Sequence, residues 1–219
     1  MKKCLLISGA VLTSLFSLAQ GNSTKNDPAA LKVLNSVSAK FKSYKTVQAN
    51  FAYKVENAAG KVLSNKTGTI LMKGTSYKLT FNGLEVYCNG MTVWSYDKTA
   101  KEVTVNNLDI SAGTITPQKL FSDFYDKDFY SLLKGESKVG AKTLQEIQMT
   151  PLDKSKSFHS VILLIDKAAQ SIYSTKVMEK DGNRFSYTVS SMKANVAATD
   201  EAFVFDPKKF PGVTVEDLR

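Results

Sequence analysis

The residue types that most often perform catalysis or bind metals are scarce in this sequence. It contains one histidine, His159, and two cysteines, Cys4 and Cys88. A catalytic or zinc-binding histidine needs partner side chains at a defined spacing, and His159 and Cys88 lie far apart. Both fall in segments of alternating residue type. We therefore interpret His159 as a surface or structural residue and Cys88 as a small buried hydrophobic residue.

The carboxylates give no stronger sign of catalysis. Asp123, Asp126 and Asp128 cluster beside Lys127 at helical spacing, which is typical of a solvated helix face. The sequence lacks a glycine-rich phosphate loop, a nucleophile elbow and a paired-carboxylate signature. We expect no enzymatic activity, no metal site and no cofactor.

The net charge is positive but dispersed. The chain has 29 lysines and arginines against 20 acidic residues, a formal charge of +9. Its lysines are scattered among all segments, and a nucleic-acid site would cluster them on one face. We therefore expect no nucleic-acid partner, and a basic surface of this kind most often serves solubility.

The first residues predict export. Met1-Lys2-Lys3 precedes an almost continuous apolar run, and Ser17 and Ala19 supply small residues for cleavage before Gln20. Residues 1–19 are thus expected to be a cleaved signal peptide, and residues 20–219 a single domain. Cleavage removes Cys4 and leaves Cys88 alone, so no intrachain disulfide can form.

Most of the remaining chain has the pattern of antiparallel strands. A helix is expected to begin at Asp27-Pro28, with an apolar stripe that includes Leu34 and Phe41. From Val47 the apolar period becomes two, and turn residues such as Asn82-Gly83 punctuate a meander. The expected strands are 47–56, 61–73, 77–81, 84–88, 91–96, 103–105, 144–149, 158–165, 171–179 and 184–192.

A second helical segment is expected over 117–134, broken near 126–128. With about ten or eleven strands and two helical segments, the sheet should curl and be covered on one face. The predicted fold class is mainly β with a helical lid (α+β), a curved antiparallel sheet forming an incomplete, half-open β-barrel covered by helices. Large apolar side chains exceed what one thin sheet needs, which is compatible with an ordinary core or with a ligand cavity between the layers.

At this point the sequence resembles the periplasmic outer-membrane lipoprotein carrier proteins (LolA-like), over roughly residues 29 to 217. The order of segments matches, and the motifs are specific in combination. The segments that carry the resemblance are Val47-Gln48-Ala49-Asn50-Phe51, Gly68-Thr69-Ile70-Leu71-Met72-Lys73, Asn89-Gly90-Met91-Thr92-Val93-Trp94-Ser95-Tyr96, Phe203-Val204-Phe205-Asp206-Pro207 and Gly212-Val213-Thr214-Val215-Glu216-Asp217.

The resemblance implies a carrier that holds lipoprotein acyl chains in a hydrophobic cavity and ferries them from the inner to the outer membrane. Its implied partners are acylated lipoproteins, an inner-membrane ATP-driven lipoprotein transporter and an outer-membrane acceptor. It also implies a periplasmic location, and we expect a monomer that needs no cofactor.

Cavity residues are assigned from alternation on the strands and from the apolar stripes of the lid. The candidates are Leu34, Phe41, Phe51, Tyr53, Tyr77, Leu79, Phe81, Trp94, Phe121 and Phe124. In the family, an arginine after the lysine of the second strand helps to hold the lid shut. Here Lys73 is followed by Gly74, so Lys73 is the candidate latch, with the charge but without the planar fork of donors of a guanidinium.

Two other functions share the expected fold. One is a periplasmic lipid-binding sensor or regulatory module, which usually carries an additional domain that this length disfavours. The other is a carrier of a different lipid. A hydrolase would need a nucleophile–base pair, which the sequence does not offer.

Overall fold

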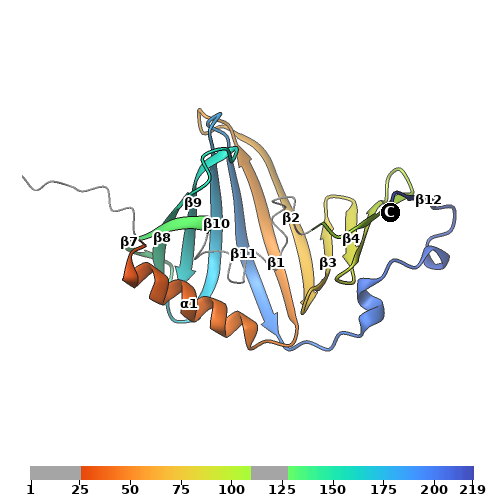
Figure 1. The fold of residues 1–219 in the computed structure, drawn as a ribbon, viewed down its shortest axis with the longest axis horizontal. Coiled ribbons are helices and arrows are strands. Elements are labelled where there is room, and N and C mark those ends of the chain that lie inside the picture. The colour runs from red at the N-terminus through yellow and green to blue at the C-terminus, as the bar shows by residue number, and fades with distance from the viewer. Residues whose placement is uncertain (1–25, 110–127) are drawn as a thin grey trace, which may run out of the picture.

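A computed structural model describes residues 26–109 and 128–219. The expected signal peptide, Phe121 and Phe124 lie outside these ranges. The described chain forms one twelve-stranded sheet that does not close, with β12 (Thr214–Asp217) at one edge and β7 (Phe129–Val139) at the other (Figure 1). This confirms the predicted half-open, mainly β architecture with a helix over one face.

The sheet is built outward from its long first strand, β1 (Val47–Glu56). Toward the β12 edge the order is β2 (Val62–Lys73), β3 (Ser76–Phe81), β4 (Leu84–Cys88), β5 (Thr92–Asp97), β6 (Glu102–Asn107) and β12 (Thr214–Asp217). Toward the β7 edge the order is β11 (Arg184–Ala194), β10 (Ser171–Glu179), β9 (Phe158–Asp166), β8 (Lys142–Pro151) and β7 (Phe129–Val139). All neighbours are antiparallel except β12 and β6, which run parallel. Every strand expected between Val47 and Met192 is present.

The helix α1 (Pro28–Lys42) begins where the sequence predicted. Asp27 is its N-cap, and the Asp27 carboxylate accepts a hydrogen bond from the Ala29 amide at 2.8 Å. Proline follows at the first helical position, where its missing N–H has no helical partner to lose. The apolar stripe of α1 lies across the sheet at the β7–β10 end (Figure 1), where Leu34 and Val37 join the core.

Asp27 also joins the helix to the edge strand β7. Its other carboxylate oxygen accepts from the Leu133 amide at 3.1 Å, and its own amide donates to the Ser131 carbonyl at 3.0 Å. The side chain of Asn26 accepts from the Ser131 amide at 2.8 Å. The start of α1 therefore occupies backbone groups that an edge strand would otherwise present to solvent.

The helical segment expected over 117–134 is wrong where the structure describes it. From Phe129 the chain is strand β7, which pairs with β8. Phe129 is buried in the core, whereas Leu132 is 49% exposed, as alternate positions of a strand require. The aromatic and apolar residues of this segment fit the period of a helix as well as that of a strand, and pairing with β8 selects the strand.

Two short 3-10 helices, η1 (Asp200–Phe203) and η2 (Pro207–Lys209), lead from β11 to β12. This segment lies on the convex face of the sheet, the face opposite α1. Phe205 and Phe210 of this segment stack with centroids 4.6 Å apart and cover Tyr87 and Tyr96. Among the residues described, none of the helices is long and apolar enough to span a membrane.

Candidate functional site

The strand register places a row of aromatic side chains on the concave face of the sheet, the face that α1 covers. Tyr53 lies opposite Tyr187 of β11, which lies opposite Thr175 of β10, which in turn lies opposite Leu163 of β9. Directly opposed residues project from the same face. Since Leu163 packs with Leu34 of α1 in one core cluster, Tyr53 and Tyr187 face the helix side.

Five rings from three strands form a continuous apolar surface there, which we call the aromatic array. It consists of Phe51, Tyr53, Phe81, Phe185 and Tyr187. Tyr53 is its centre, with ring centroids 5.4 Å from Phe81, 5.0 Å from Tyr187 and 6.3 Å from Phe185. Phe51 and Phe81 stack at 6.0 Å. Tyr187 remains 36% exposed. The array is therefore large, uncharged and partly accessible, as a surface that binds hydrocarbon must be.

Gly68 makes the array continuous across β2. The ring of Phe51 lies over this glycine, so that a Cβ built at Gly68 would lie 2.6 Å from Phe51 Cζ and 2.8 Å from the Thr80 carbonyl oxygen. No side chain fits between β1 and β3 at this point. The glycine thus lets Phe51 of β1 reach Phe81 of β3 across the intervening strand.

We expect Gly68→Ala to displace the Phe51 ring and lower the free energy of unfolding by about 1–3 kcal/mol, as overpacking does. Binding of a fluorescent fatty acid should weaken in parallel. Thr69→Ala, at the exposed neighbouring position on the convex face, is the matched control. Unchanged stability and binding in Gly68→Ala would contradict the role given to this glycine.

Tyr77 and Leu79 lie on the same face as the array but deeper, in a core cluster with Met72 and Cys88. Tyr77 is buried, and burial together with its hydrogen-bond contact to Cys88 raises the pKa of its hydroxyl to about 12. Burial also raises the pKa of the Cys88 thiol, although the Gly90 amide donates to its Sγ at 3.4 Å. These side chains form the floor of the concave face.

Because thiolate is the reactive form and burial disfavours it, we expect Cys88 to react slowly with iodoacetamide at pH 8. The native protein should be alkylated at least about tenfold more slowly than the protein unfolded in urea. Comparable rates in the two states would show that Cys88 is accessible and that this floor opens readily.

The lid residues predicted on α1 are both placed against the sheet. Leu34 is 2% exposed within the core, and Phe41 packs over the cluster that contains Met72 and Cys88. Between Phe41, Val37, Ile172 and Met192 remains an apolar gap of only about 10 Å³, room for about one water molecule. An acyl chain can therefore enter beneath α1 only if the helix moves.

Trp94 is placed on the opposite face, so its assignment to the cavity was wrong. It pairs with Tyr87 and packs in the convex-face cluster with Phe205. Val93, the neighbour of Trp94, lies opposite Cys88, which in turn lies opposite Tyr77 on the face of the array. The connection between the paired residues Cys88 and Val93 has four residues instead of the expected two, and Asn89 accepts hydrogen bonds in it from the amides of Met91 and Thr92 at 3.0 and 2.9 Å. This two-residue shift keeps every side chain on its face, and Trp94 projects from the convex face because successive residues of a strand alternate.

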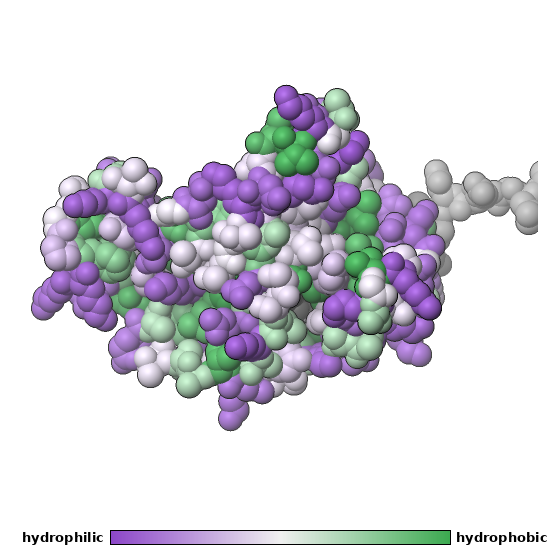
Figure 2. Space-filling model, turned by 180° about the vertical axis from the view of Figure 1, so that it is seen from behind, coloured by the Kyte–Doolittle hydropathy of each residue, from purple (hydrophilic) through white to green (hydrophobic). Residues whose placement is uncertain are grey.

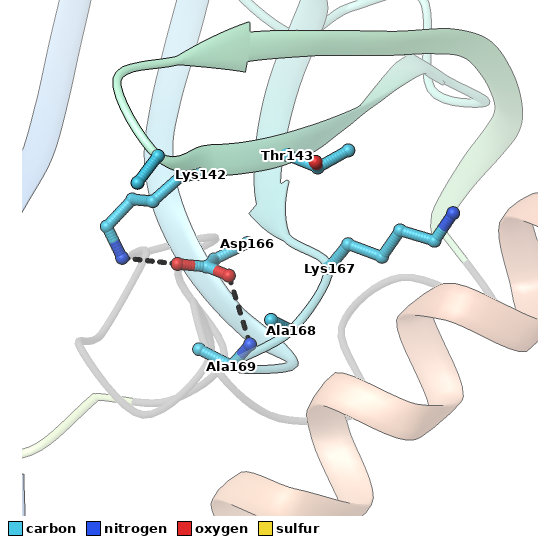
Figure 3. Close-up of a pocket in the computed structure, with 7 residues that line it drawn as sticks. Lys142, Thr143, Asp166, Lys167, Ala168 and Ala169 are labelled. Atoms are coloured by element: carbon cyan, nitrogen blue, oxygen red, sulfur yellow. Dashed lines mark hydrogen bonds and ion pairs between the residues drawn. The ribbon is translucent and has the colours of Figure 1, made fainter.

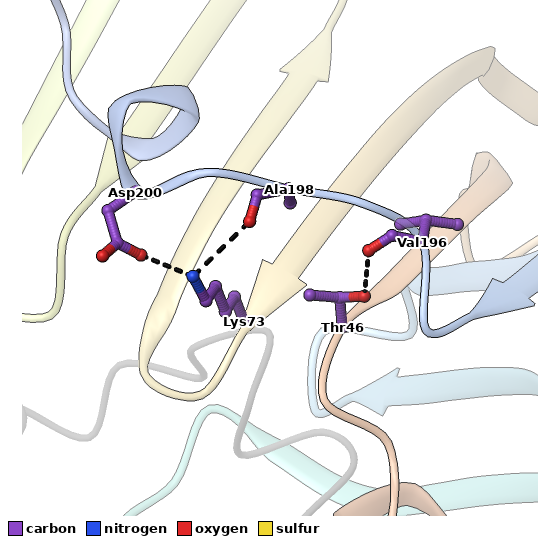
Figure 4. A network of polar contacts seen from close by, with 5 residues as sticks. All are labelled: Thr46, Lys73, Val196, Ala198 and Asp200. Atoms are coloured by element: carbon purple, nitrogen blue, oxygen red, sulfur yellow. Dashed lines mark hydrogen bonds and ion pairs between the residues drawn. The ribbon is translucent and has the colours of Figure 1, made fainter.

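Lys73 contacts the C-terminal segment (Figure 4). Its Nζ donates to Asp200 Oδ1 at 2.7 Å and to the Ala198 carbonyl at 3.4 Å, while Thr46 Oγ1 donates to the Val196 carbonyl at 2.5 Å. Neither partner of Lys73 belongs to α1. These contacts fasten the chain as it leaves β11, which differs from the latch on the helical lid that the sequence suggested.

Sequence reasoning missed the contribution of β11. Phe185, Tyr187 and Val189 alternate along this strand, and the first two belong to the array. The period of two was visible, but only the pairing of β11 with β1, distant in the sequence, shows that its rings meet Tyr53.

A pocket of about 450 Å³ lies elsewhere, where the β7–β8 and β9–β10 turns meet (Figure 3). The Lys142 ammonium pairs with Asp166, whose carboxylate also accepts from the Ala169 amide at 3.0 Å. These hydrogen bonds lower the pKa of Asp166. The other charged lining residue, Lys167, pairs with Glu136 at 2.7 Å, so each charged group of the pocket has an ionic partner. Within the described ranges, no cluster of three His, Cys, Asp or Glu side chains could hold a metal ion.

Comparison with known proteins agrees with this geometry. The model of the family "Outer membrane lipoprotein carrier protein LolA" matches residues 42–206. An outer-membrane lipoprotein carrier protein from Pseudomonas putida (strain W619) is 26% identical over 223 residues, covering 98% of each chain.

Among solved structures, an uncharacterized conserved protein from Thermus thermophilus has a TM-score of 0.60 at 12% identity, covering 86% of this chain and 99% of that one. At this identity the likeness concerns the fold alone. A LolA superfamily protein from Nitrosomonas europaea is also similar, with 13% identity, a TM-score of 0.43 and coverage of 80% and 97%. The family match spans most of the chain and includes every strand that builds the aromatic array, and the chain therefore belongs to the LolA family of outer membrane lipoprotein carrier proteins.

Proposed function

We propose that this protein carries the acyl chains of lipoproteins through the periplasm, from an inner-membrane ATP-driven transporter to an acceptor at the outer membrane. The observation that carries the proposal is the aromatic array on the concave face, beside a helix that covers the adjoining core. Family membership and the full-length relative named as a lipoprotein carrier support it.

The energetics of the concave face fit a reversible carrier. Each methylene removed from water contributes about 0.8 kcal/mol, so several methylenes on the array offset the cost of displacing α1. At the far end of the helix, Lys40 Nζ donates to the Ala169 carbonyl at 2.8 Å, beside the gap under Phe41. Release requires only a competing apolar site, so no chemical step is needed.

The proposal is tested with inner-membrane vesicles that contain newly made lipoproteins and the transporter. The mature protein and ATP are added, and the soluble fraction is assayed for a complex of carrier and lipoprotein. We expect lipoprotein to appear only with both additions and only when it is acylated. If an active transporter releases none, the proposal is wrong for lipoproteins, and mass spectrometry of lipid extracted from the purified protein would show whether another lipid is carried.

A further inference from the structure

The strand β2 is longer than its neighbour β3, and this leaves part of its backbone without a neighbouring strand. β3 pairs with β2 only from Gly68 to Lys73, whereas β1 pairs with β2 from Val62 to Met72. The long strands β1, β2 and β11 project beyond β3 and β4 (Figure 1). No described strand pairs with residues 62–67 of β2 on the β3 side.

The register identifies which backbone groups face this open edge. Lys73 and Ser76 close a two-residue loop and therefore form a hydrogen-bonded pair. Hydrogen-bonded pairs alternate along an antiparallel ladder, so the amides and carbonyls of Asn65 and Thr67 point away from β1. The intervening Ser64 and Lys66 bond to β1 instead. The open edge thus presents two donors and two acceptors in extended geometry.

Hydrophobic side chains are exposed at the start of the same edge. Val62 and Leu63 are 49% and 58% exposed. Seen from behind, the projecting end of the sheet carries hydrophobic residues among hydrophilic ones (Figure 2). Natural proteins usually protect an open, partly apolar strand edge, because another strand readily pairs with it.

The open edge is continuous with the aromatic array. Gly68 and Phe81 form the last pair of the β2–β3 ladder, and Phe81 belongs to the array. Beyond Phe81 the chain turns at Asn82-Gly83, and Lys66 Nζ donates to Asn82 Oδ1 at 2.7 Å across the resulting notch. A strand added beside Asn65 and Thr67 would begin next to the ring of Phe81.

From this continuity we propose that the open edge of β2 binds, by strand addition, the extended peptide that follows the acylated cysteine of a lipoprotein cargo. The inference rests on the proposed function, since the acyl chains on the array hold this peptide at the notch. Backbone hydrogen bonds are independent of side-chain identity, so such an edge accepts linkers of many sequences. A peptide satisfies both the donors and the acceptors of the edge, whereas a lipid surface offers no matching ladder.

The test compares two probes: a diacylglyceryl-cysteine amide, and the same group followed by a neutral six-residue Ser/Thr/Val linker. We expect the linker to strengthen binding about tenfold, which corresponds to about 1.4 kcal/mol from the added backbone hydrogen bonds. Asn65→Pro removes one outward N–H but no bond to β1, as proline at a strand edge allows. It should abolish the gain from the linker, while Asn65→Ala should retain it. The wild-type protein, Asn65→Pro and Asn65→Ala should all bind the linker-free probe equally.

A second measurement does not depend on how the proline variant folds. Linkers N-methylated at alternate positions are tested on the wild-type protein, and one of the two methylation registers should lose the tenfold gain while the other keeps it. Equal affinity for both unmodified probes would overturn strand addition, whereas failure of both probes to bind would overturn the acyl-carrier function itself. Sedimentation with phosphatidylglycerol vesicles that depends on Leu63, with no effect of the linker, would assign the edge to a membrane surface and also overturn the proposal.

Discussion

Phe51→Glu is expected to abolish acyl-chain binding while Lys54→Glu leaves it unchanged. Phe51 lies within the aromatic array and stacks on Phe81, whereas Lys54 points to the convex face and pairs with Glu56 at 3.2 Å. A carboxylate at position 51 removes an aromatic contact and places a charge where hydrocarbon must lie. The combined loss of roughly 3 kcal/mol corresponds to about a 100-fold weaker affinity for a fluorescent fatty acid.

Tyr187→Glu tests the same surface in a variant that is expected to fold, should Phe51→Glu misfold. Tyr187 is 36% exposed, so a carboxylate there remains hydrated in the empty protein, and the fold should persist by circular dichroism. Leu34→Glu is also expected to abolish binding, but Leu34 is almost fully buried and its substitution would destabilise the fold as well. If Phe51→Glu and Tyr187→Glu bind the fatty acid as tightly as Lys54→Glu does, the acyl chain does not lie on the array.

Local signals in the sequence predicted local structure well. The pair Asp27-Pro28 specifies the start of α1 because a cap and a preformed backbone angle act within one turn. Asn82-Gly83 has positive φ angles of 50° and 83°, which a two-residue hairpin turn requires, so this hairpin could be predicted from two residues. The alternation of Phe51 and Tyr53 assigned both to one face correctly.

What could not be predicted depends on contacts between distant residues. The face of Trp94 follows from the pairing of Val93 with Cys88, which places Val93 on the side of the array and Trp94 on the opposite side. The strand at Phe129 exists because β8 pairs with it. Phe205 lies in a segment that carries the family resemblance, but only the fold shows that it covers Tyr87 and Tyr96 together with Phe210 and that β12 joins β6. The spacing of apolar residues along the sequence does not reveal these contacts.

Asp27→Ala provides the sharpest test of whether α1 is a movable lid. Asp27 caps α1 and accepts from the Leu133 amide of the edge strand β7, and it lies outside the array. Loss of the cap costs about 1 kcal/mol, and the second hydrogen bond adds a similar amount. The free energy of unfolding of Asp27→Ala, measured in urea, should therefore be lower than that of the wild type by about 1–2 kcal/mol.

The same substitution should strengthen fatty-acid binding. If ligand enters only when α1 has moved, the apparent affinity is the intrinsic affinity reduced by the fraction of protein that is open. Weakening the closed state by about 1 kcal/mol raises that fraction about fivefold, and the affinity rises by the same factor. Lys32→Ala, on the exposed side of α1, should change neither quantity. A destabilised Asp27→Ala protein with unchanged or weaker affinity would mean that the helix stays in place, and that acyl chains reach the array from its exposed side at Tyr187.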